Sequence, residues 1–480
     1  GCIAPKGVDH MSVAVQPQPA GDARAPRRGG WLDRFFAIQA SGSDLRTEIL
    51  AGLTTFVTMA YILFVNPQIL GAAGLDPNAV LMATALSSGV ATLIMGLFAR
   101  MPFALAPGMG LNAYFAFTVV LGQGVPWQTV LGAVFMDGVI FLIISLLPIR
   151  ERILRDIPLN IRLATSTAIG LFIAFIGLKS AGLVVANEST LVALGDVRSG
   201  PAVLCLLGLV ITALLMARQV KGAILWGVLI TTALGAFFHA PDANGVMQPL
   251  THLPRSLGDV VRAPDLGVLA QVAGQLDVRS ALQLGLLTVI FTFTFVNMFD
   301  TAGTLVGLGT KMGVIDEKTG TFPRVGRVLV SDALATMIGA VLGTSTVTTY
   351  VESAAGIGQG GRTGLTAVVT GLLFLLAVFF WPLAGVIPAA ATAPALIIVG
   401  LLMMEPIRRL NLDDITEALP AFLTVLGIPL TFSIATGMVL GIVSYVVLKL
   451  VTGRIREVSV TMWILAAIFI AHYAFMGSGA

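Results

Sequence analysis

Apolar stretches follow one another almost without interruption from about residue 48 to residue 452. A helix that crosses a lipid bilayer needs roughly 20 apolar residues, and a helix satisfies its own backbone hydrogen bonds in lipid. Charged residues make up only 11% of the chain, against about 25% in a typical soluble domain. These features exclude a soluble globular protein and predict an all-α polytopic membrane protein.

The apolar stretches divide into fourteen predicted transmembrane spans, several of which are short or interrupted by glycine and proline. The predicted spans are 48–68, 79–99, 103–121, 127–148, 160–186, 201–217, 222–240, 281–309, 326–343, 344–357, 364–387, 389–404, 417–433 and 435–450. A fifteenth apolar stretch, 461–476, follows a charged linker. We expect it to be a helix that lies at the membrane surface or against the bundle.

The positions of the basic residues predict the orientation of the chain. Lys and Arg are enriched in the cytoplasmic loops of membrane proteins. If the N-terminus is inside and the spans alternate, nearly all of the 28 Lys and Arg residues lie in inside loops or tails. Those in outside loops are Arg198, Arg255, Arg262 and Arg279. This bias predicts a multi-pass protein of the cell (inner) membrane with both termini in the cytoplasm.

The longest predicted outside loop divides the spans into seven and seven. Because seven is odd, two halves that share one fold must have inverted topologies. The expected organisation is a disordered cytoplasmic tail at 1–35 (of which 1–10 resemble a vector-derived tag), a first seven-span repeat at 48–240, an extracytoplasmic linker at 241–280, a second repeat at 281–452, and a C-terminal tail with a hydrophobic helix at 453–480.

Weak internal similarity supports two repeats. The segment ATALSSGVATLIMGLFARMPFALAPGMGLNAYF resembles the later segment SDALATMIGAVLGTSTVTTYVESAAG. Each is a helix of small residues followed by a short span broken by Gly, Pro, Ser or Thr. Paired interrupted helices in inverted repeats indicate a transporter binding site near the middle of the membrane.

Ionisable side chains within the spans are rare, and each costs several kcal/mol at the bilayer centre. The residues that lie well inside predicted spans are Asp137, Lys179, Asp300, Asp332 and Glu352. A charge in this position needs either a partner or a function. A buried carboxylate that empties and refills during transport is a natural proton carrier.

Glu352 stands in the broken span TSTVTTYVESAAG and is interpreted as a ligand-facing carboxylate. Its alternative is a structural one, as the cap of a half-helix or the partner of Arg362. Asp300 stands in TFTFVNMFDTAGTLVG, with a helix N-cap as its alternative. Both acids are candidates for proton coupling. Asn297 precedes Asp300 by three residues on the same helical face, so the two are predicted to face one cavity.

The remaining polar candidates are less specific. Asn112 lies in APGMGLNAYF, the interruption of span 3, and is a candidate ligand residue with a helix-breaking cap as the alternative. Asp137 and Asp332 are interpreted as polar links through Ser and Thr, with a functional role as the alternative, and Asp332 is a third candidate for proton coupling. Lys179 is expected to extend to the membrane interface or to pair with an acid.

The sequence contains neither a Walker A motif nor an HExxH motif, so no nucleotide site or zinc-peptidase site is expected. Its two cysteines, Cys2 and Cys205, are too few for a metal cluster. No cofactor and no nucleic acid partner is therefore expected. Transport would draw its energy from an ion gradient or from substrate flow alone, and the expected partners are the lipid bilayer, protons and a small solute.

Five segments closely resemble one family of transporters. They are TEILAGLTTFVTMAYILFVNP, PFALAPGMGLNAYFAFTVV, FVNMFDTAGTLVG, GTSTVTTYVESAAGIGQGGRTGLTA and ATAPALIIVG. They resemble the nucleobase:cation symporter-2 superfamily, and within it the AzgA-like adenine/guanine/hypoxanthine permeases. The resemblance runs from about residue 31 to residue 452.

The resemblance implies the fold of the bacterial uracil permease, with fourteen spans in two inverted repeats of seven. A core domain would comprise spans 1–4 and 8–11 and a gate domain spans 5–7 and 12–14, with short strands in broken spans 3 and 10. The implied activity is proton-coupled import of purine nucleobases by an elevator-type movement of the core against the gate. Relatives often form homodimers, so a homodimer is the implied assembly.

The family's binding residues match Asp300 in span 8, Glu352 in span 10 and Asn112 in span 3 of this sequence. Many AzgA-like sequences have Asp where this one has Asn297, and an amide cannot take up a proton, which argues against a proton-acceptor role there. Carboxylates would accept hydrogen bonds from the purine N–H groups. The candidates for stacking on the flat purine face are Phe115, Phe299 and Tyr350.

Three alternatives stay open at the level of sequence. An inorganic-anion carrier on the same fold is disfavoured by the facing acids. A passive nucleobase channel would show no dependence on protons. An intramembrane enzyme such as a prenyl transferase would need paired acids for Mg²⁺ and a basic diphosphate site, and no such cluster is seen. The sequence does not select among adenine, guanine and hypoxanthine.

Overall fold

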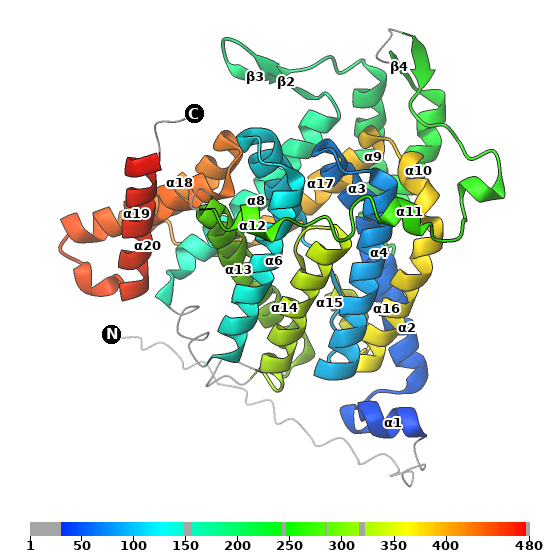
Figure 1. Cartoon of the computed structure of the whole chain (residues 1–480), viewed down its shortest axis with the longest axis horizontal. Helices are drawn as coiled ribbons and strands as arrows, with labels where there is room; N and C mark the ends of the chain where they lie inside the picture. The colour runs from blue at the N-terminus through cyan, green and yellow to red at the C-terminus, as the bar shows by residue number, and fades with distance from the viewer. Residues whose placement is uncertain (1–29, 148–155, 242–245, 284–285, 316–321, 477–480) are drawn as a thin grey trace, which may run out of the picture.

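The computed structural model describes residues 30–147, 156–241, 246–283, 286–315 and 322–476. Most of the long helices run side by side through a single bundle (Figure 1). The β2–β3 hairpin and β4 project from one end of this bundle, whereas α1 lies at the opposite end (Figure 1). The tail predicted for residues 1–35 lies mostly outside the described residues, but its last part forms the helix α1 (Trp31–Phe36).

The described part of the first half of the chain is helical except for four short strands and the connecting segments. Its elements are η1 (Gln39–Ser41), α2 (Leu45–Met59), α3 (Ile62–Ala72), α4 (Pro77–Ile94), η2 (Met95–Ala99), β1 (Leu105–Pro107), α5 (Met109–Ala113), η3 (Tyr114–Gly122), α6 (Trp127–Leu146), α8 (Leu159–Ser180), β2 (Val184–Asn187), β3 (Leu191–Leu194), α9 (Gly200–Ala217), α10 (Ala223–Leu234), η4 (Gly235–Phe237) and β4 (His239–Pro241).

The second half begins with short elements and continues with long helices. Its elements are β5 (Met247–Pro249), η5 (Leu257–Asp259), α11 (Leu266–Leu269), α12 (Val278–Ala281), α13 (Leu287–Met312), α14 (Val325–Leu342), β6 (Val347–Thr349), α15 (Ser353–Gly358), α16 (Gly364–Ala377), η7 (Val378–Gly385), α17 (Ala389–Met403), η8 (Glu405–Arg409), α18 (Ile415–Thr431), α19 (Ile434–Val451), η9 (Ile455–Glu457) and α20 (Val460–Met476).

Ten helices within the described residues are long and apolar enough to cross a membrane. Three further apolar helices are shorter: Met109–Gly122, Ala223–Phe237 and Ile415–Thr431. The predicted span 344–357 consists of strand β6 and the six-residue helix α15, which is too short to cross a membrane as a helix. The chain is thus a mostly helical polytopic membrane protein, and the count of fourteen crossings stays a prediction.

The two broken spans meet in a buried two-stranded sheet. Strand β1 pairs antiparallel with β6, in the register Leu105↔Thr349, Ala106↔Thr348 and Pro107↔Val347. All residues of both strands are buried. The β-branched run VTT favours an extended backbone in β6, whereas Pro107 and Gly108 separate β1 from the helix that follows. Short strands therefore lie where the resemblance placed them.

Two further hairpins add strands outside the broken spans. Strand β2 pairs with β3, and β4 pairs with β5. In the first hairpin the side chain of Asn187 accepts hydrogen bonds from the backbone N–H groups of Ser189 and Thr190, which closes the turn. Turns of this kind form locally through Asn side chains, so Asn187 was a local signal for a hairpin in a segment predicted as a loop.

The long helices pack in two groups. In one group α4 and α2 contact α16, and α14 contacts α4 and α6. In the other, α8 contacts α17 and α18, and α9 contacts α10 and α17. Glycines allow close approach within each group: a Cβ on Gly364 would lie 2.0 Å from the Gly96 carbonyl oxygen, and one on Gly400 2.4 Å from that of Gly170. Small residues serve this purpose at helix interfaces in membranes.

The apolar stretch predicted at 461–476 forms α20, which packs against α19 (Figure 1). Met462, Leu465 and Phe469 of this helix are buried. The ring of Phe469 lies 5.6 Å from that of Phe291 on α13, measured between centroids. Of the two expected placements, the structure thus shows the helix against the bundle.

Candidate functional site

The centre of the candidate site is the junction between the two broken spans. The backbone N–H of Gly108 donates to the Thr346 carbonyl (2.9 Å), and that of Tyr350 donates to the Ala104 carbonyl (2.9 Å). A Cβ on Gly108 would lie 3.1 Å from Cγ2 of Thr348 and 4.0 Å from Oδ2 of Asp300. The absence of a side chain at Gly108 therefore brings the start of α5 against both β6 and an acid of α13.

Glu352 lies between β6 and α15, and its side chain does not cap α15. Instead its Oε1 accepts a 2.6 Å hydrogen bond from the hydroxyl of Tyr61. Tyr61 is not among the residues predicted from the sequence; it lies fully buried at the break between α2 and α3. A tyrosine within an apolar span needs a partner for its hydroxyl. This requirement could have indicated Tyr61 from the sequence.

The backbone N–H of Arg362 hydrogen-bonds to an acid other than Glu352. Its N–H donates to Oε1 of Glu48 (2.9 Å), and the other carboxylate oxygen accepts from the backbone N–H and hydroxyl of Thr366 (3.2 and 2.6 Å). Thr363 donates a further backbone hydrogen bond to it (3.3 Å). Glu48 is fully buried and caps the start of α16 from α2. It was missed because it lies at the edge of the first predicted span.

Asp300 lies in the middle of α13, which excludes the N-cap interpretation. Its side chain is half-buried, and no described residue hydrogen-bonds its carboxylate. It lies close enough to Asp332 and Glu352 to interact with their charges. The structure thus brings together the two acids on which the sequence interpretation depends, with Tyr350 beside both of them.

Asp332 is the anchor of strand β6. Its carboxylate accepts hydrogen bonds from the backbone N–H and the hydroxyl of Thr349 (both 2.7 Å). The hydroxyls of Thr301 (2.8 Å) and Thr348 (3.1 Å) also donate to it. These contacts tie α14 to β6 and α13. They agree with the interpretation of Asp332 as a polar link and leave its proposed proton-coupling role as a prediction.

Asn297 contacts a different set of groups from Asp300. Its Nδ2 donates to Oδ2 of Asp137 (3.2 Å) and to the Thr336 hydroxyl (3.3 Å). Its Oδ1 lies 3.5 Å from the Thr301 hydroxyl. Asn297 is fully buried, so the structure does not place it in one cavity with Asp300, as the spacing of three residues had suggested.

Asn112 also lies within a buried network of amides and hydroxyls. Its Nδ2 donates to Oδ1 of Asn66 (2.7 Å), and the Ser345 hydroxyl donates to its Oδ1. Asn66 in turn donates to the hydroxyls of Thr84 (2.7 Å) and Thr344 (2.8 Å). The amide of Asn112 is occupied by these contacts, so in this conformation it holds α5 to α3 and to the segment before β6.

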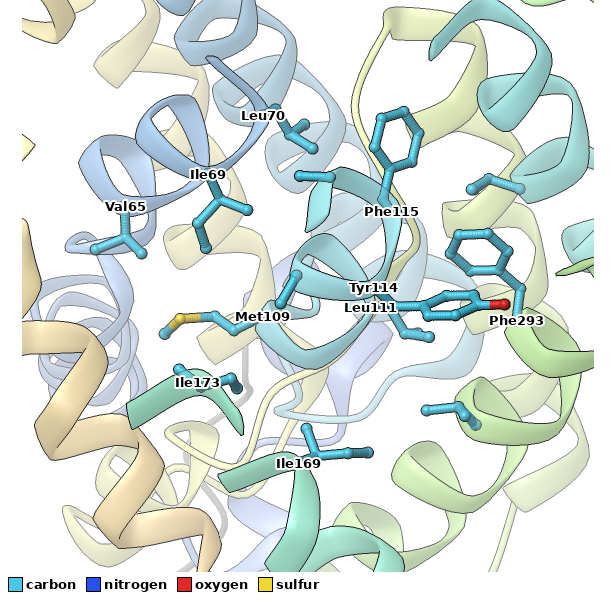
Figure 2. Packing of buried hydrophobic residues seen from close by; sticks show 14 of the residues in the cluster. Val65, Ile69, Leu70, Met109, Leu111, Tyr114, Phe115, Ile169, Ile173 and Phe293 are labelled. Carbon is cyan, nitrogen blue, oxygen red and sulfur yellow. The ribbon is translucent and has the colours of Figure 1, made fainter. Parts of the chain in front are cut away.

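The three aromatic candidates have different surroundings. Tyr350 donates its hydroxyl to the Pro107 carbonyl (2.5 Å) and so links β6 to β1. Phe299 is half-buried, with its ring 4.5 Å from that of Phe295. Phe115 is fully buried in the apolar cluster that also holds Tyr114 (Figure 2). Tyr350 therefore lies next to the acids, Phe299 packs against Phe295, and Phe115 packs in the core.

Lys179 lies outside this site. It is exposed at the end of α8, with its Nζ 5.3 Å from the centroid of the Phe432 ring. This position agrees with the expectation that it extends to the interface.

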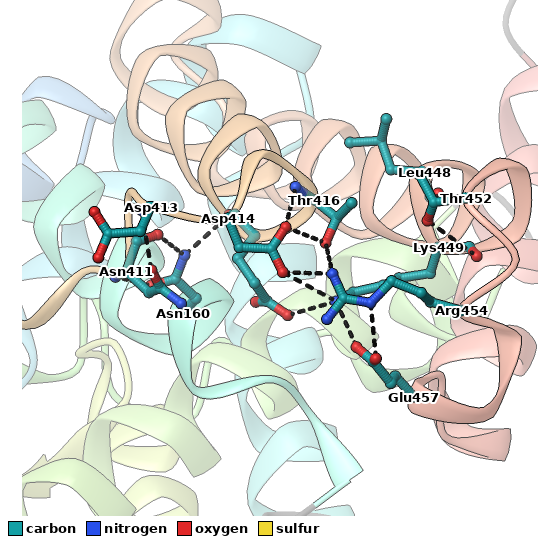
Figure 3. Close-up of polar contacts among 11 residues, drawn as sticks. Asn160, Asn411, Asp413, Asp414, Thr416, Leu448, Lys449, Thr452, Arg454 and Glu457 are labelled. Atoms are coloured by element: carbon teal, nitrogen blue, oxygen red, sulfur yellow. Dashed lines mark hydrogen bonds and ion pairs between the residues drawn. The ribbon is translucent and has the colours of Figure 1, made fainter.

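A second polar cluster joins the ends of α18 and α19 to the segment before α20 (Figure 3). The buried Nζ of Lys449 lies 3.1 Å from Glu417 and 2.7 Å from Glu457. Arg454 pairs with Asp414 (2.5 Å) and Glu457 (2.8 Å). The Arg454 guanidinium holds the pKa values of both Asp414 and Glu457 below their usual range. A cavity of about 550 Å³ beside this cluster is lined by Glu417, Glu457 and other polar residues.

Comparison with known proteins identifies the family. A family model described as the permease family (Xan_ur_permease) matches residues 46–440. The chain belongs to this permease family. The permease is therefore an integral membrane protein, and its resemblance to the nucleobase:cation symporter-2 superfamily is confirmed. Because the family and the relatives described next are permeases, the prenyl-transferase alternative is set aside.

Two relatives named as purine permeases align with almost the whole chain. It is 45% identical to the adenine permease AdeP of Escherichia coli over 447 residues, which is 93% of this chain and 97% of AdeP. It is 44% identical to the guanine/hypoxanthine permease PbuG of Bacillus subtilis over 456 residues, which is 93% of this chain and 100% of PbuG.

The fold of the permease is similar to that of a solved transporter. The transmembrane domain of the cyanobacterial bicarbonate transporter BicA superimposes with a TM-score of 0.58 at 15% sequence identity. The match covers 82% of this chain and 97% of that domain. At this level of identity the likeness shows a shared fold alone.

Proposed function

We propose that this permease imports purine nucleobases, namely adenine, guanine or hypoxanthine, by proton-coupled secondary transport across the cell membrane. The observation that carries the proposal is the similarity, at 44 to 45% identity over 93% of the chain, to permeases named for these bases. The same proposal places both termini in the cytoplasm and a homodimer in the membrane.

The chemistry of the site supports a purine as the substrate. Carboxylate oxygens accept hydrogen bonds from ring and exocyclic N–H groups, and Glu352 and Asp300 carry such oxygens near the β1–β6 junction. In this proposal the Tyr350 ring, which lies beside both acids, contacts the flat face of the base. In this proposal Glu352 is the main substrate-binding acid.

The arrangement of acids also supports coupling to protons. The Asp300 carboxylate has no hydrogen-bond donor among the described residues, and it lies near Asp332 and Glu352. Like charges that share a site repel one another, so a proton bound by Asp300 relieves this repulsion when the site is occupied. Asp300 would therefore take up the transported proton.

The packing supports movement of one helix group against the other. We propose fourteen crossings in two inverted repeats, with the β1–β6 site in the core and α8, α17 and α18 in the gate. Helix α5 lies directly against α8, because a Cβ on Gly110 would lie 2.5 Å from Cγ2 of Ile169. Such a close, apolar contact across the two groups is suited to a sliding interface of an elevator.

The anion-carrier alternative draws support only from likeness of fold, for example to BicA. An anion site would be lined by donors and cations, whereas here the groups around the β1–β6 junction include Asp300, Asp332 and Glu352. A passive nucleobase channel would let the base pass without coupling to protons.

The proposal is tested by uptake of labelled adenine, guanine, hypoxanthine and uracil into cells that lack their own purine carriers. Expression of the permease is expected to give purine accumulation that unlabelled purines compete away and a protonophore abolishes, with no uptake of bicarbonate. Well-expressed protein that takes up no purine contradicts the substrate class. Purine uptake that is insensitive to the protonophore contradicts the coupling alone.

A further inference from the structure

Asp137 is a fully buried acid in α6 whose carboxyl group accepts fewer hydrogen bonds than that of Asp332. Its side chain is 0% exposed, and its Oδ2 accepts one hydrogen bond, at 3.2 Å, from Asn297. Its other oxygen, Oδ1, is buried and has no hydrogen-bond partner among the described residues. An ionised carboxylate left in this state costs several kcal/mol.

Asp332 provides the contrast within the same network. It is also 0% exposed, but it accepts hydrogen bonds from Thr349 twice and from Thr301 and Thr348. Several donors stabilise a carboxylate as an anion. The two acids are joined through Asn297 and Thr301. One buried network therefore holds a carboxylate with several hydrogen-bond donors and another with few.

The groups that face Asp137 come from three segments. Asn297 and Thr294 belong to α13, Asp332 belongs to α14, and Thr346 precedes β6. Asp332 is the ionisable group among them. Helix α12 meets α6 farther along, where the Asp277 N–H donates to the Gln128 carbonyl (2.9 Å), and η3 also packs against α6.

The hydroxyl of Thr346 also lacks a hydrogen-bond partner among the described residues. Its Oγ1 is buried, and its side chain faces the Asp137 carboxyl. The Thr346 hydroxyl can donate to an ionised Asp137 and can accept from a protonated one, so binding of a proton reverses the direction of this contact. The Thr346 carbonyl accepts from Gly108, so this hydrogen bond bears directly on the position of β6 and of the site it carries.

We propose that Asp137 is a second proton-binding site, and that loading and release of its proton accompany each transport cycle. The inference rests on the proposed function, since it adds a proton site to the purine carrier. One proton from water binds the Asp137 carboxylate, its O–H donates to Thr346, and the same proton leaves to water on the other side. No other bond changes. Because Thr346 leads into β6, the state of Asp137 acts on Glu352 through the strand.

The test uses the purified full-length permease in proteoliposomes with labelled hypoxanthine or adenine. Asp137→Asn keeps the shape but can neither bind nor release the proton. We expect this variant to retain exchange of labelled for unlabelled base and to lose accumulation against a gradient, so that the internal concentration only equals the external one. The matched control is Asp413→Asn, an exposed acid, which should accumulate purine as the unchanged protein does.

Infrared difference spectroscopy gives a second readout that does not depend on transport. The unchanged permease should show the C=O band of a protonated carboxyl group that is absent in Asp137→Asn. Thr346→Val, which removes the acceptor and keeps the volume, should shift this band.

The outcomes separate the two proposals. If the unchanged permease accumulates purine with protons and Asp137→Asn accumulates it equally, the inference is wrong and the proposed function stands. If no protonated carboxyl band is lost in Asp137→Asn, or Thr346→Val leaves the band unmoved, the inference is also wrong. Failure of the unchanged permease to transport any purine contradicts the proposed function, and the infrared bands still decide whether Asp137 holds a proton.

Discussion

The hydroxyl of Tyr61 donates a 2.6 Å hydrogen bond to Glu352 from a position 291 residues away in the sequence. Tyr61 occupies the break between α2 and α3, and Glu352 occupies the turn between β6 and α15. Two interruptions in helical structure, one from each half of the chain, are thus held together at the candidate site. The hydrogen bond fixes the orientation of the acid that we propose binds the base.

Tyr61→Phe removes this hydroxyl and keeps the ring. A hydrogen bond to a charged group contributes about 1.5–3 kcal/mol, and each 1.4 kcal/mol is a factor of about ten in affinity. We expect KM for purine uptake to rise roughly tenfold or more, with a smaller change in the maximal rate. The concentration dependence of uptake measures both values, and an unchanged KM would show that Tyr61 does not position Glu352.

Gly108→Ala tests the close packing at the β1–β6 junction. The new methyl group would lie 3.1 Å from Thr348 and 4.0 Å from the Asp300 carboxylate, so β6 or Asp300 must move. We expect purine uptake to fall while the amount of folded protein is preserved. Gly303→Ala is the matched control, because a Cβ at Gly303 meets nothing within 4 Å. Equal uptake by both variants would contradict this account of the site.

Glu48→Ala tests the buried cap of α16. The change leaves the backbone N–H groups of Arg362, Thr363 and Thr366 without their acceptor, and each unsatisfied buried group costs about 1–3 kcal/mol. We expect a clear fall in the Tm of the detergent-solubilised protein. Glu188→Ala, at an exposed position, should leave the Tm nearly unchanged, and a similar Tm for both variants would show that the cap is dispensable.

The charged cluster before α20 predicts a dependence of stability on pH. The pKa values of Asp414 and Glu457 are lowered in the folded protein, first of all by hydrogen bonds from Arg454. A lowered folded-state pKa adds stability that is fully present above the unfolded-state pKa and is lost as the pH falls through the folded-state value.

Arg454→Ala is therefore expected to lower the Tm at neutral pH and to lose this difference in acid. The difference should shrink as the pH falls below the ordinary pKa values of Asp and Glu, because both partners of Arg454 then become neutral in either protein. Thermal unfolding from neutral to acid pH measures it. A difference that stays constant down to strongly acid conditions would mean that the ion pairs do not stabilise this segment.

The sequence predicted the helical bundle well because apolar length and glycine or proline breaks are local properties. Helix α6 (Trp127–Leu146) lies almost where span 127–148 was predicted. The same breaks correctly indicated that residues near Asn112 and Glu352 leave the helix. The hairpin closed by Asn187 was missed because its turn signal lay in a segment interpreted as a loop.

The contacts within the site could not be predicted because they join distant segments. Tyr61 meets Glu352, Glu48 meets Thr366 and Asn112 meets Asn66 through packing of separate helices. Spacing along α13 suggested that Asn297 and Asp300 share a cavity. The structure turns Asn297 toward Asp137 instead, because the polar partners on α6 and α14 lie on that side.

The most direct test of the central claim is hypoxanthine and adenine uptake by the purified permease in proteoliposomes under an imposed pH gradient, acidic outside. The account predicts transient accumulation above the external concentration in the unchanged protein, abolished by a protonophore and by Glu352→Gln. It predicts no accumulation of bicarbonate. Purine entry that only equilibrates, with or without the pH gradient, or that is unaffected by Glu352→Gln, would contradict it.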